Sequence, residues 1–276
     1  IPTMGGFMFI IGIALAVILG GLITGTLSVH ALAILGLSVA YGAVGLVDDY
    51  AKIKKKENAG LTPRQKLVLQ ILVAAVFILV LFLESDGLPS LMIPFTGISI
   101  DLPWPVYIIF AAFVIVGADN AVNLTDGIDG LAASVTVPVA VFFAAVGARI
   151  GNTGVTIFAG ALAGGLLGFL IYNFNPAKVF MGDTGSLFLG GAVAGMAFAC
   201  DMPLILLLVG LIYIIETLSV ILQVTYFKAT HGKRLFKMAP IHHHFEMCGW
   251  GEKRIVLTFT AVTIVLCLAA YFVALP

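Results

Sequence analysis

The chain has 276 residues, of which 61% are hydrophobic and only 10% are charged, and its formal net charge is zero. Soluble domains are nearer half apolar and a quarter charged, so this composition excludes an ordinary soluble domain and indicates a polytopic membrane protein. The balanced charge provides no basic surface for nucleic acid. The three cysteines are scattered, and their spacing predicts neither a disulfide framework nor a metal site.

Hydrophobic runs recur along the whole chain, each close to the roughly 20 residues that a helix needs to cross a bilayer. Internal repeats and segments typical of a soluble domain are missing from the sequence. The predicted architecture is therefore all-α, a single helical bundle that forms one integral-membrane domain over 1–276. We expect nine spans, at 5–23, 30–47, 67–83, 104–118, 131–148, 154–173, 185–200, 203–227 and 255–275.

The connection over 84–103 differs from the others because it carries no basic residue. Apolar segments at 91–95 and 98–102 flank Thr96-Gly97, which predicts a short outer β-hairpin, although Pro94 disfavours strand in the first segment.

Basic residues gather on one side of the predicted bundle. Every Lys and Arg except Arg149 falls in the connections 50–66, 174–184 and 228–254. The positive-inside rule makes this side cytoplasmic. The same span count places all the acidic and histidine motifs described below on this face.

The lysines near the second and third spans receive two different interpretations. Lys66 begins the third span, and if the loop folds back it lies near Asp48-Asp49, so it is a candidate phosphate ligand. The run that follows the second span is interpreted as a set of anchors for anionic lipid, and it contains Lys52, Lys54, Lys55 and Lys56.

The segment Asp119–Gly130 is acidic and contains no cation. We interpret it as a loop that enters the next span. Carboxylates at a membrane edge are costly unless something binds them, and a divalent cation, alone or with a phosphate, is a natural partner. Asn123, Asp126 and Asp129 are therefore predicted to bind a nucleotide, a sugar or a metal.

Two more acidic motifs lie at span ends. Asp48-Asp49 ends the second span, where the helix dipole disfavours acids. Adjacent helical residues point in different directions, so one carboxylate can face a site while the other faces a support. Asp183 lies between two glycines that allow close approach to a ligand, and with Asn173 nearby we predict that Asp183 is a metal ligand.

The eighth predicted span carries Glu216 and Gln223 on one stripe. Glu216 fits a structural role as well as a functional one, whereas Gln223 lies nearer the cytoplasmic edge and is a site candidate. Three successive histidines follow in the next connection, His242, His243 and His244. Their side chains diverge on a helix and cannot easily close around one zinc, but they can contact phosphate or transfer protons near neutral pH.

Several of these motifs, taken in order, closely resemble those of the phospho-N-acetylmuramoyl-pentapeptide transferases, a family within the polyprenyl-phosphate N-acetylhexosamine-1-phosphate transferase superfamily. The resemblance implies ten spans, with one more before Ile1, a multi-pass location in the bacterial cytoplasmic (inner) membrane, an active site facing the cytoplasm, and a homodimer. The motifs are Pro2–Gly6, Val47–Tyr50, Asn120–Gly130, Phe180–Ser186 and Pro240–Glu246.

The resemblance also implies a reaction. Undecaprenyl phosphate attacks UDP-MurNAc-pentapeptide, UMP leaves, and lipid I is formed for peptidoglycan synthesis, with Mg²⁺ as cofactor. It implies Mg²⁺ on Asp183, with Asp48 and Asp49 near the reacting phosphates and His243 in the catalytic set. The substrate-binding residues that it implies are Lys66, Asn123, Asp126, Asp129, Asn173, Gln223, His242 and His244.

We expect a single displacement, because a phosphate monoester is largely ionised near neutral pH, with a second pKa of roughly 6. Asp48 would then orient the lipid phosphate or complete its deprotonation. Two alternatives stay open: a transferase of GlcNAc-1-phosphate, which assays with different sugar nucleotides would separate, and a secondary transporter. Transporters bind near the bilayer midplane, whereas the polar motifs here lie at one edge.

Overall fold

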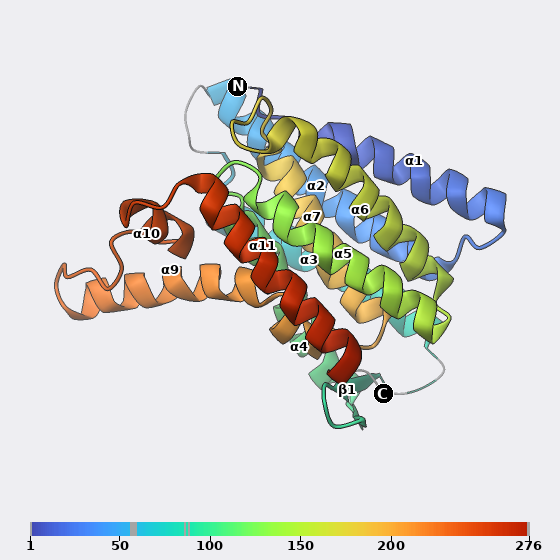
Figure 1. Cartoon of the computed structure of the whole chain (residues 1–276). Helices are drawn as coiled ribbons and strands as arrows, with labels where there is room; N and C mark the ends of the chain where they lie inside the picture. Colours follow the sequence, from blue (N-terminus) through green and yellow to red (C-terminus); the bar gives the residue numbers. More distant parts are fainter. Residues whose placement is uncertain (1, 56–59, 86, 88, 275–276) are drawn as a thin grey trace.

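The computed structural model describes residues 2–55, 60–85, 87 and 89–274. Within this part of the chain, eight helices are long and apolar enough to cross a membrane. This confirms an all-α polytopic membrane protein, whose helices pack side by side in Figure 1. The eight are α1 (Gly6–Thr24), α2 (Val29–Lys55), α3 (Pro63–Glu84), α4 (Trp104–Thr125), α5 (Leu131–Ile150), α6 (Thr153–Asn173), α9 (Leu211–Ala229) and α11 (Glu252–Ala269).

The seventh predicted span is also helical, as α7 (Gly182–Ala199), but it is less apolar than the eight. Every residue from Thr184 to Ala199 is buried, so α7 is surrounded by protein instead of lipid. It packs mainly against α2 and α4. Its glycines allow this close packing. Lipid tails are as apolar as the helices, so helices in a membrane associate through such close contacts and not through the hydrophobic effect.

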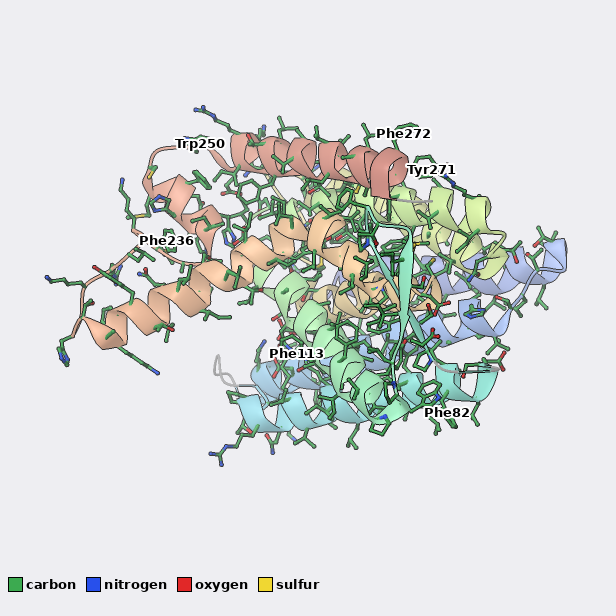
Figure 2. The ribbon with its side chains drawn as sticks, turned by 90° about the horizontal axis from the view of Figure 1, so that it is seen from below. Phe82, Phe113, Phe236, Trp250, Tyr271 and Phe272 are labelled. Atoms are coloured by element: carbon green, nitrogen blue, oxygen red, sulfur yellow. The ribbon has the colours of Figure 1, made fainter. Side chains whose placement is uncertain are left out.

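The remaining span surfaces are apolar and outward-facing. Phe113 of α4 and Phe272, at the end of the α11 span, are exposed, and Phe272 lies at the outer edge of the molecule in Figure 2. Exposed side chains of this kind are expected where a helix contacts lipid tails.

The eighth predicted span, 203–227, is not continuous. It divides into a 3₁₀ turn (Pro203–Ile205), the short α8 (Leu206–Val209) and α9, with a break at Gly210. α9 and the following α10 (Ile241–Met247) extend away from the other helices in Figure 1. The prediction of one span over 203–227 was therefore wrong in its first part, because the membrane-length helix begins only at Leu211.

The fourth span is longer than predicted, because α4 continues through the segment that we interpreted as a loop. Two of its polar side chains bond the preceding turn of α4: Asn120 donates to the Val116 carbonyl at 2.9 Å, and the Thr125 hydroxyl donates to the Ala121 carbonyl at 2.8 Å. Asn120 also donates to Gln70 of α3 at 3.0 Å. The connection to α5 is consequently only 126–130.

The predicted hairpin is confirmed. β1 (Ser90–Ile93) and β2 (Ile98–Asp101) are antiparallel, with Ser90 opposite Asp101 and Ile93 opposite Ile98. Pro94 follows β1 directly, so the strand ends before the residue that lacks a backbone donor.

Gly45 allows α2 to approach the first turn of α7. A Cβ at this position would overlap the backbone carbonyl of Asp183. We expect Gly45→Ala to push α2 from α7, to destabilise the protein by about 1–3 kcal/mol as overpacking does, and to reduce activity. Thermal unfolding in detergent, together with an activity assay, measures both effects.

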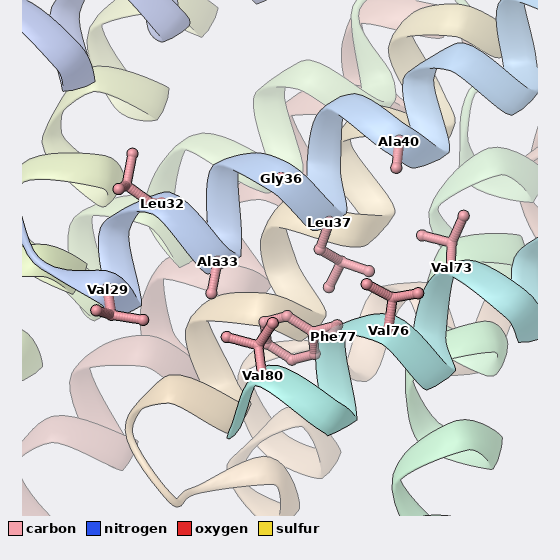
Figure 3. Close-up of a pocket in the computed structure, with 10 residues that line it drawn as sticks. All are labelled: Val29, Leu32, Ala33, Gly36, Leu37, Ala40, Val73, Val76, Phe77 and Val80. Carbon is pink, nitrogen blue, oxygen red and sulfur yellow. The ribbon is translucent and has the colours of Figure 1, made fainter. Parts of the chain in front are cut away.

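Gly36→Ala is the matched control, because it adds the same methyl group and the same helix propensity to α2. Gly36 lines an apolar groove of about 360 Å³ between α2 and α3 (Figure 3). Apart from the adjacent residues and the nearby backbone of α2 itself, no described atom lies within 4 Å of its added Cβ. Equal unfolding temperatures and activities in the two variants would contradict the assigned contact.

Candidate active site

Three carboxylates from two helices meet at one end of the bundle. Asp48 and Asp49 lie in the sixth turn of α2, and Asp183 lies in the first turn of α7. One oxygen from each lies within 4.8 Å of the others, which is a suitable arrangement for a metal ion. The structure thus joins two motifs that are far apart in the sequence.

The two adjacent aspartates have different surroundings. Asp49 accepts hydrogen bonds from the Thr184 amide and hydroxyl at 3.0 and 2.8 Å, and from the Asp183 amide at 3.3 Å. It therefore caps the positive end of α7 from another helix. Asp48 Oδ1 accepts a hydrogen bond from the Leu61 amide at 2.6 Å, and its other oxygen, Oδ2, points toward the carboxylate cluster.

The start of α3 is fixed beside Asp48. Thr62 and Gln65 form a reciprocal capping box, in which the Gln65 amide donates to the Thr62 hydroxyl and the Thr62 amide donates to the Gln65 side chain. This start places Lys66 in the first turns of α3, with its ammonium nitrogen 3.2 Å from Asp183 Oδ2.

Lys52 also lies inside the cluster. Its Nζ is 2.6 Å from Asp48 Oδ2, 2.9 Å from Asp183 Oδ2 and 3.8 Å from Asp49 Oδ1. The interpretation of Lys52 as a lipid anchor is therefore wrong. Its spacing of three and four residues from the two aspartates was the missed signal, because such pairs share a helix face.

The other lysines of that run do not join this cluster in the part of the chain that the structure describes. Lys54 is exposed. The side chain of Lys55, and Lys56 as a whole, lie outside the described residues, so their interpretation as lipid anchors stays a prediction.

The end of α4 supplies an amide and a further carboxyl. Asn123 donates to Asp183 Oδ1 at 3.1 Å and to the Ser186 hydroxyl at 2.7 Å. Asp126 follows the last helical residue, where burial, and then the negative charges of Asp183 and Asp49, raise its pKa to about 7. A cation in the cleft would favour the ionised form of this carboxyl.

Asp129 connects three segments around the cleft. Its Oδ2 accepts from the Ala177 amide at 2.8 Å and from Asn175 at 3.2 Å, and its own amide donates to Glu252 at 3.2 Å. Glu252, in the first turn of α11, was missed by sequence reasoning, since nothing local distinguishes it from a helix-start acid. Asn173 is buried and donates to the Val179 carbonyl at 2.9 Å.

These residues surround a cleft of about 530 Å³, within the usual size range of ligand pockets. The segment Pro2–Gly6 contributes to its wall, because the Phe180 amide donates to the Pro2 carbonyl and the Gly5 amide donates to the Phe180 carbonyl, both at 2.8 Å. The lining residues are Thr3, Asp49, Lys52, Ile53, Asn123, Asp126, Gly127, Ile128, Asp129, Asn173, Phe180, Gly182 and Asp183.

The three histidines on α10 face different partners. His242 is buried with Nδ1 2.9 Å from Glu216 Oε2, and its ring packs against Gly127 of the cleft wall, where a Cβ would overlap it. His243 pairs with Glu246, and His244 accepts from the Lys237 amide at 3.1 Å. His242 thus touches Gly127, a residue that lines the cleft.

Gln223 has local partners. It accepts from the Leu235 and Phe236 amides at 3.1 and 2.8 Å and donates to the Phe236 carbonyl at 3.1 Å, which holds the segment between α9 and α10. These bonds explain its position without a ligand. Its predicted role in substrate binding stays a prediction.

The fold and the site together define a class of protein: a polytopic helical membrane protein with an acidic, lysine-containing cleft where its helices end. Carboxylates suit a hard divalent cation, and ammonium groups suit phosphate.

Comparisons with known proteins identify the family. The profile of glycosyl transferase family 4 matches residues 31–201. The chain is 47% identical to a phospho-N-acetylmuramoyl-pentapeptide-transferase of Listeria welshimeri over 264 residues, which is 96% of this chain and 81% of that protein. It is 49% identical to one of Clostridium perfringens over 270 residues, 98% of this chain and 83% of that protein. The chain belongs to the phospho-N-acetylmuramoyl-pentapeptide-transferases of glycosyl transferase family 4.

Proposed function

We propose that this protein transfers phospho-MurNAc-pentapeptide from UDP-MurNAc-pentapeptide to undecaprenyl phosphate, giving lipid I and UMP. The observation that carries the proposal is the cluster of Asp48, Asp183, Lys52 and Lys66 at the cleft, in a chain about half identical to transferases of that name. Lys52 and Asp183 line the cleft itself. UMP release from UDP-MurNAc-pentapeptide by the purified protein, with undecaprenyl phosphate present, tests it.

Asp183 and Asp48 are the residues that would hold Mg²⁺. Their carboxylate oxygens face the same point, and oxygen ligands of this type suit the ion. Both oxygens of Asp49 are engaged by the start of α7, so Asp49 supports the site from behind. The chemistry that the ion supplies is neutralisation of the pyrophosphate and stabilisation of the leaving UMP.

The side chains of the protein would position the substrates and neutralise part of their charge. Lys52 and Lys66 bind phosphate oxygens, and Asn123 orients Asp183. Asp48 already accepts hydrogen bonds on both oxygens, from Leu61 and Lys52, which favours an orienting role over attack on phosphorus. A single displacement follows, because the lipid phosphate is itself a competent nucleophile. Exchange of labelled UMP into the nucleotide sugar without lipid phosphate would argue for a covalent intermediate instead.

Orientation and assembly are part of the proposal. The cleft end of the bundle would face the cytoplasm of a bacterial cell, in the inner membrane, because nearly all basic residues lie in connections at that end. A homodimer is supported by the family resemblance.

Removal of divalent ions provides a direct test of the cofactor. We expect a chelator to reduce UMP release by at least about 100-fold, and Mg²⁺ to restore it, because the carboxylates of Asp48, Asp49 and Asp183 would otherwise repel the pyrophosphate. Assays on one preparation before chelation, after it and after re-addition of Mg²⁺ supply the comparison. An unchanged rate in chelator, at unchanged unfolding temperature, would exclude an essential metal.

A further inference from the structure

A layer of buried and partly buried polar side chains lies deeper in the bundle than the carboxylate cluster. Gln70 of α3 donates through Nε2 to Asp119 Oδ2 of α4 at 2.6 Å, and Asn120 donates to Gln70 Oε1 at 3.0 Å. The Tyr41 hydroxyl of α2 donates to the Gln70 carbonyl at 3.0 Å. We call Tyr41, Gln70, Asp119 and Asn120 the polar layer.

The polar layer is costly in a membrane protein. Asp119 is 0% exposed and Gln70 is 1% exposed, and Asp119 Oδ1 has no hydrogen-bond partner among the described residues. α7 closes the layer from the other side, because a Cβ on Gly190 would overlap the Asp119 backbone. Well-packed apolar side chains could stabilise the contact between these helices at least as well as polar ones. Helix association alone therefore does not explain a buried carboxyl at this position.

The helical register links the polar layer to the site. Lys66 precedes Gln70 by four residues on α3, and Asn123 follows Asp119 by four residues on α4. Residues four apart lie one turn apart on the same helix face, so both lie directly above the layer. Their side chains meet on one carboxylate: Lys66 contacts Asp183 Oδ2 at 3.2 Å, and Asn123 donates to Asp183 Oδ1 at 3.1 Å.

α2 also links the polar layer to the site through its helical register. Asp48 follows Tyr41 by seven residues, about two turns, so the helix face that carries the Tyr41 bond also carries Asp48. The polar layer therefore connects α2, α3 and α4, three helices that each supply a group to the cluster, while the fourth, α7, packs against it.

We infer that Gln70 and Asp119 are positioning residues, whose hydrogen bond fixes α3 against α4 so that Lys66 and Asn123 engage the two oxygens of Asp183. The inference rests on the proposed function. The unusually polar composition of the layer follows from this role, because a directional hydrogen bond specifies rotation and register, whereas apolar contacts tolerate small shifts.

Paired substitutions test this role. Asp119→Leu and Gln70→Met each remove the bond at similar volume, and we expect each to lower kcat for UMP release by about tenfold or more, with a smaller change in KM for the nucleotide substrate. The double variant should lose no more than the single variants, because both changes break the same interaction. Asp119→Asn can still present a carbonyl oxygen to Gln70, so it should keep most of the activity.

A measurement independent of turnover accompanies the kinetics. Mn²⁺ binding, followed by electron paramagnetic resonance, should weaken severalfold in Asp119→Leu and stay near the unmodified value in Asp119→Asn, because the orientation of Asp183 depends on the layer. Ser38→Ala is the control for loss of a buried hydroxyl, since Ser38 bonds only the Ile34 carbonyl of its own helix in the described structure. It should leave both kcat and Mn²⁺ binding unchanged.

The outcomes separate the inference from the proposed function. Unmodified kcat and Mn²⁺ affinity in folded Asp119→Leu and Gln70→Met would overturn the positioning role. An Asp119→Asn variant as impaired as Asp119→Leu would also overturn it, because the charge would then matter instead of the bond. If the unmodified protein and Ser38→Ala both release no UMP, the proposed function fails.

Discussion

Asp183→Asn is expected to lower the rate of UMP release by about 10³-fold while the protein stays folded. Asp183 is the point where Lys52, Lys66 and Asn123 converge, and its charge is also the one that a divalent ion would require. The amide keeps the shape but removes the charge, which leaves two ammonium groups with less counter-charge and the ion with one ligand fewer. Losses of this order follow removal of one group that stabilises transition-state charge.

Initial rates of UMP release and thermal unfolding in detergent measure the effect. Asp101→Asn is the matched control, because Asp101 is exposed on the hairpin strand β2, and it should behave like the unmodified protein. An Asp183→Asn variant that retains more than a tenth of the rate would remove Asp183 from the centre of the mechanism.

Lys52→Met should lower the rate by about 10²-fold. The ammonium joins Asp48 and Asp183 at 2.6 and 2.9 Å, so its removal leaves these carboxylates facing each other and takes away a cation for the substrate's phosphates. Charge-assisted hydrogen bonds of this kind are the strong ones in proteins. Kinetics at saturating Mg²⁺ would measure the loss that the ion cannot compensate.

Lys54→Met provides the comparison, since Lys54 lies two residues further along α2 and is exposed. It should retain nearly full activity. If Lys52→Met were as active as Lys54→Met, the interpretation of Lys52 as a lipid anchor would be restored and its place in the cleft would have no catalytic meaning.

Hydrophobic periodicity was sufficient to predict most of the fold. Eight of the nine predicted spans each became one helix, the remaining one, at 203–227, is broken at Gly210, and the hairpin formed where Thr96-Gly97 predicted it. The length of α4 could not be predicted, because its polar residues are satisfied by distant partners: Asp119 meets Gln70 on α3. The break at Gly210 has a similar cause, since glycine is frequent in membrane helices and only tertiary packing decides where one ends.

The aspartates of the site were predictable because unpaired carboxylates at a membrane edge require a partner. Lys52 was not, because a lysine run after a span is usually explained by the positive-inside rule. Glu252 and Ser186 were not predicted for another reason, because neither has a distinctive local sequence. Only the fold brings Glu252 to Asp129 and Ser186 to Asn123. Local sequence thus predicts which charges need partners, whereas the partners come from distant segments.

The proposed transfer is tested most directly by UMP release from UDP-MurNAc-pentapeptide in Mg²⁺, measured with and without undecaprenyl phosphate. We expect release only when the lipid phosphate is present, with one lipid I formed for each UMP. Folded protein that releases no UMP with both substrates present, or releases it equally fast without the lipid phosphate, would contradict it.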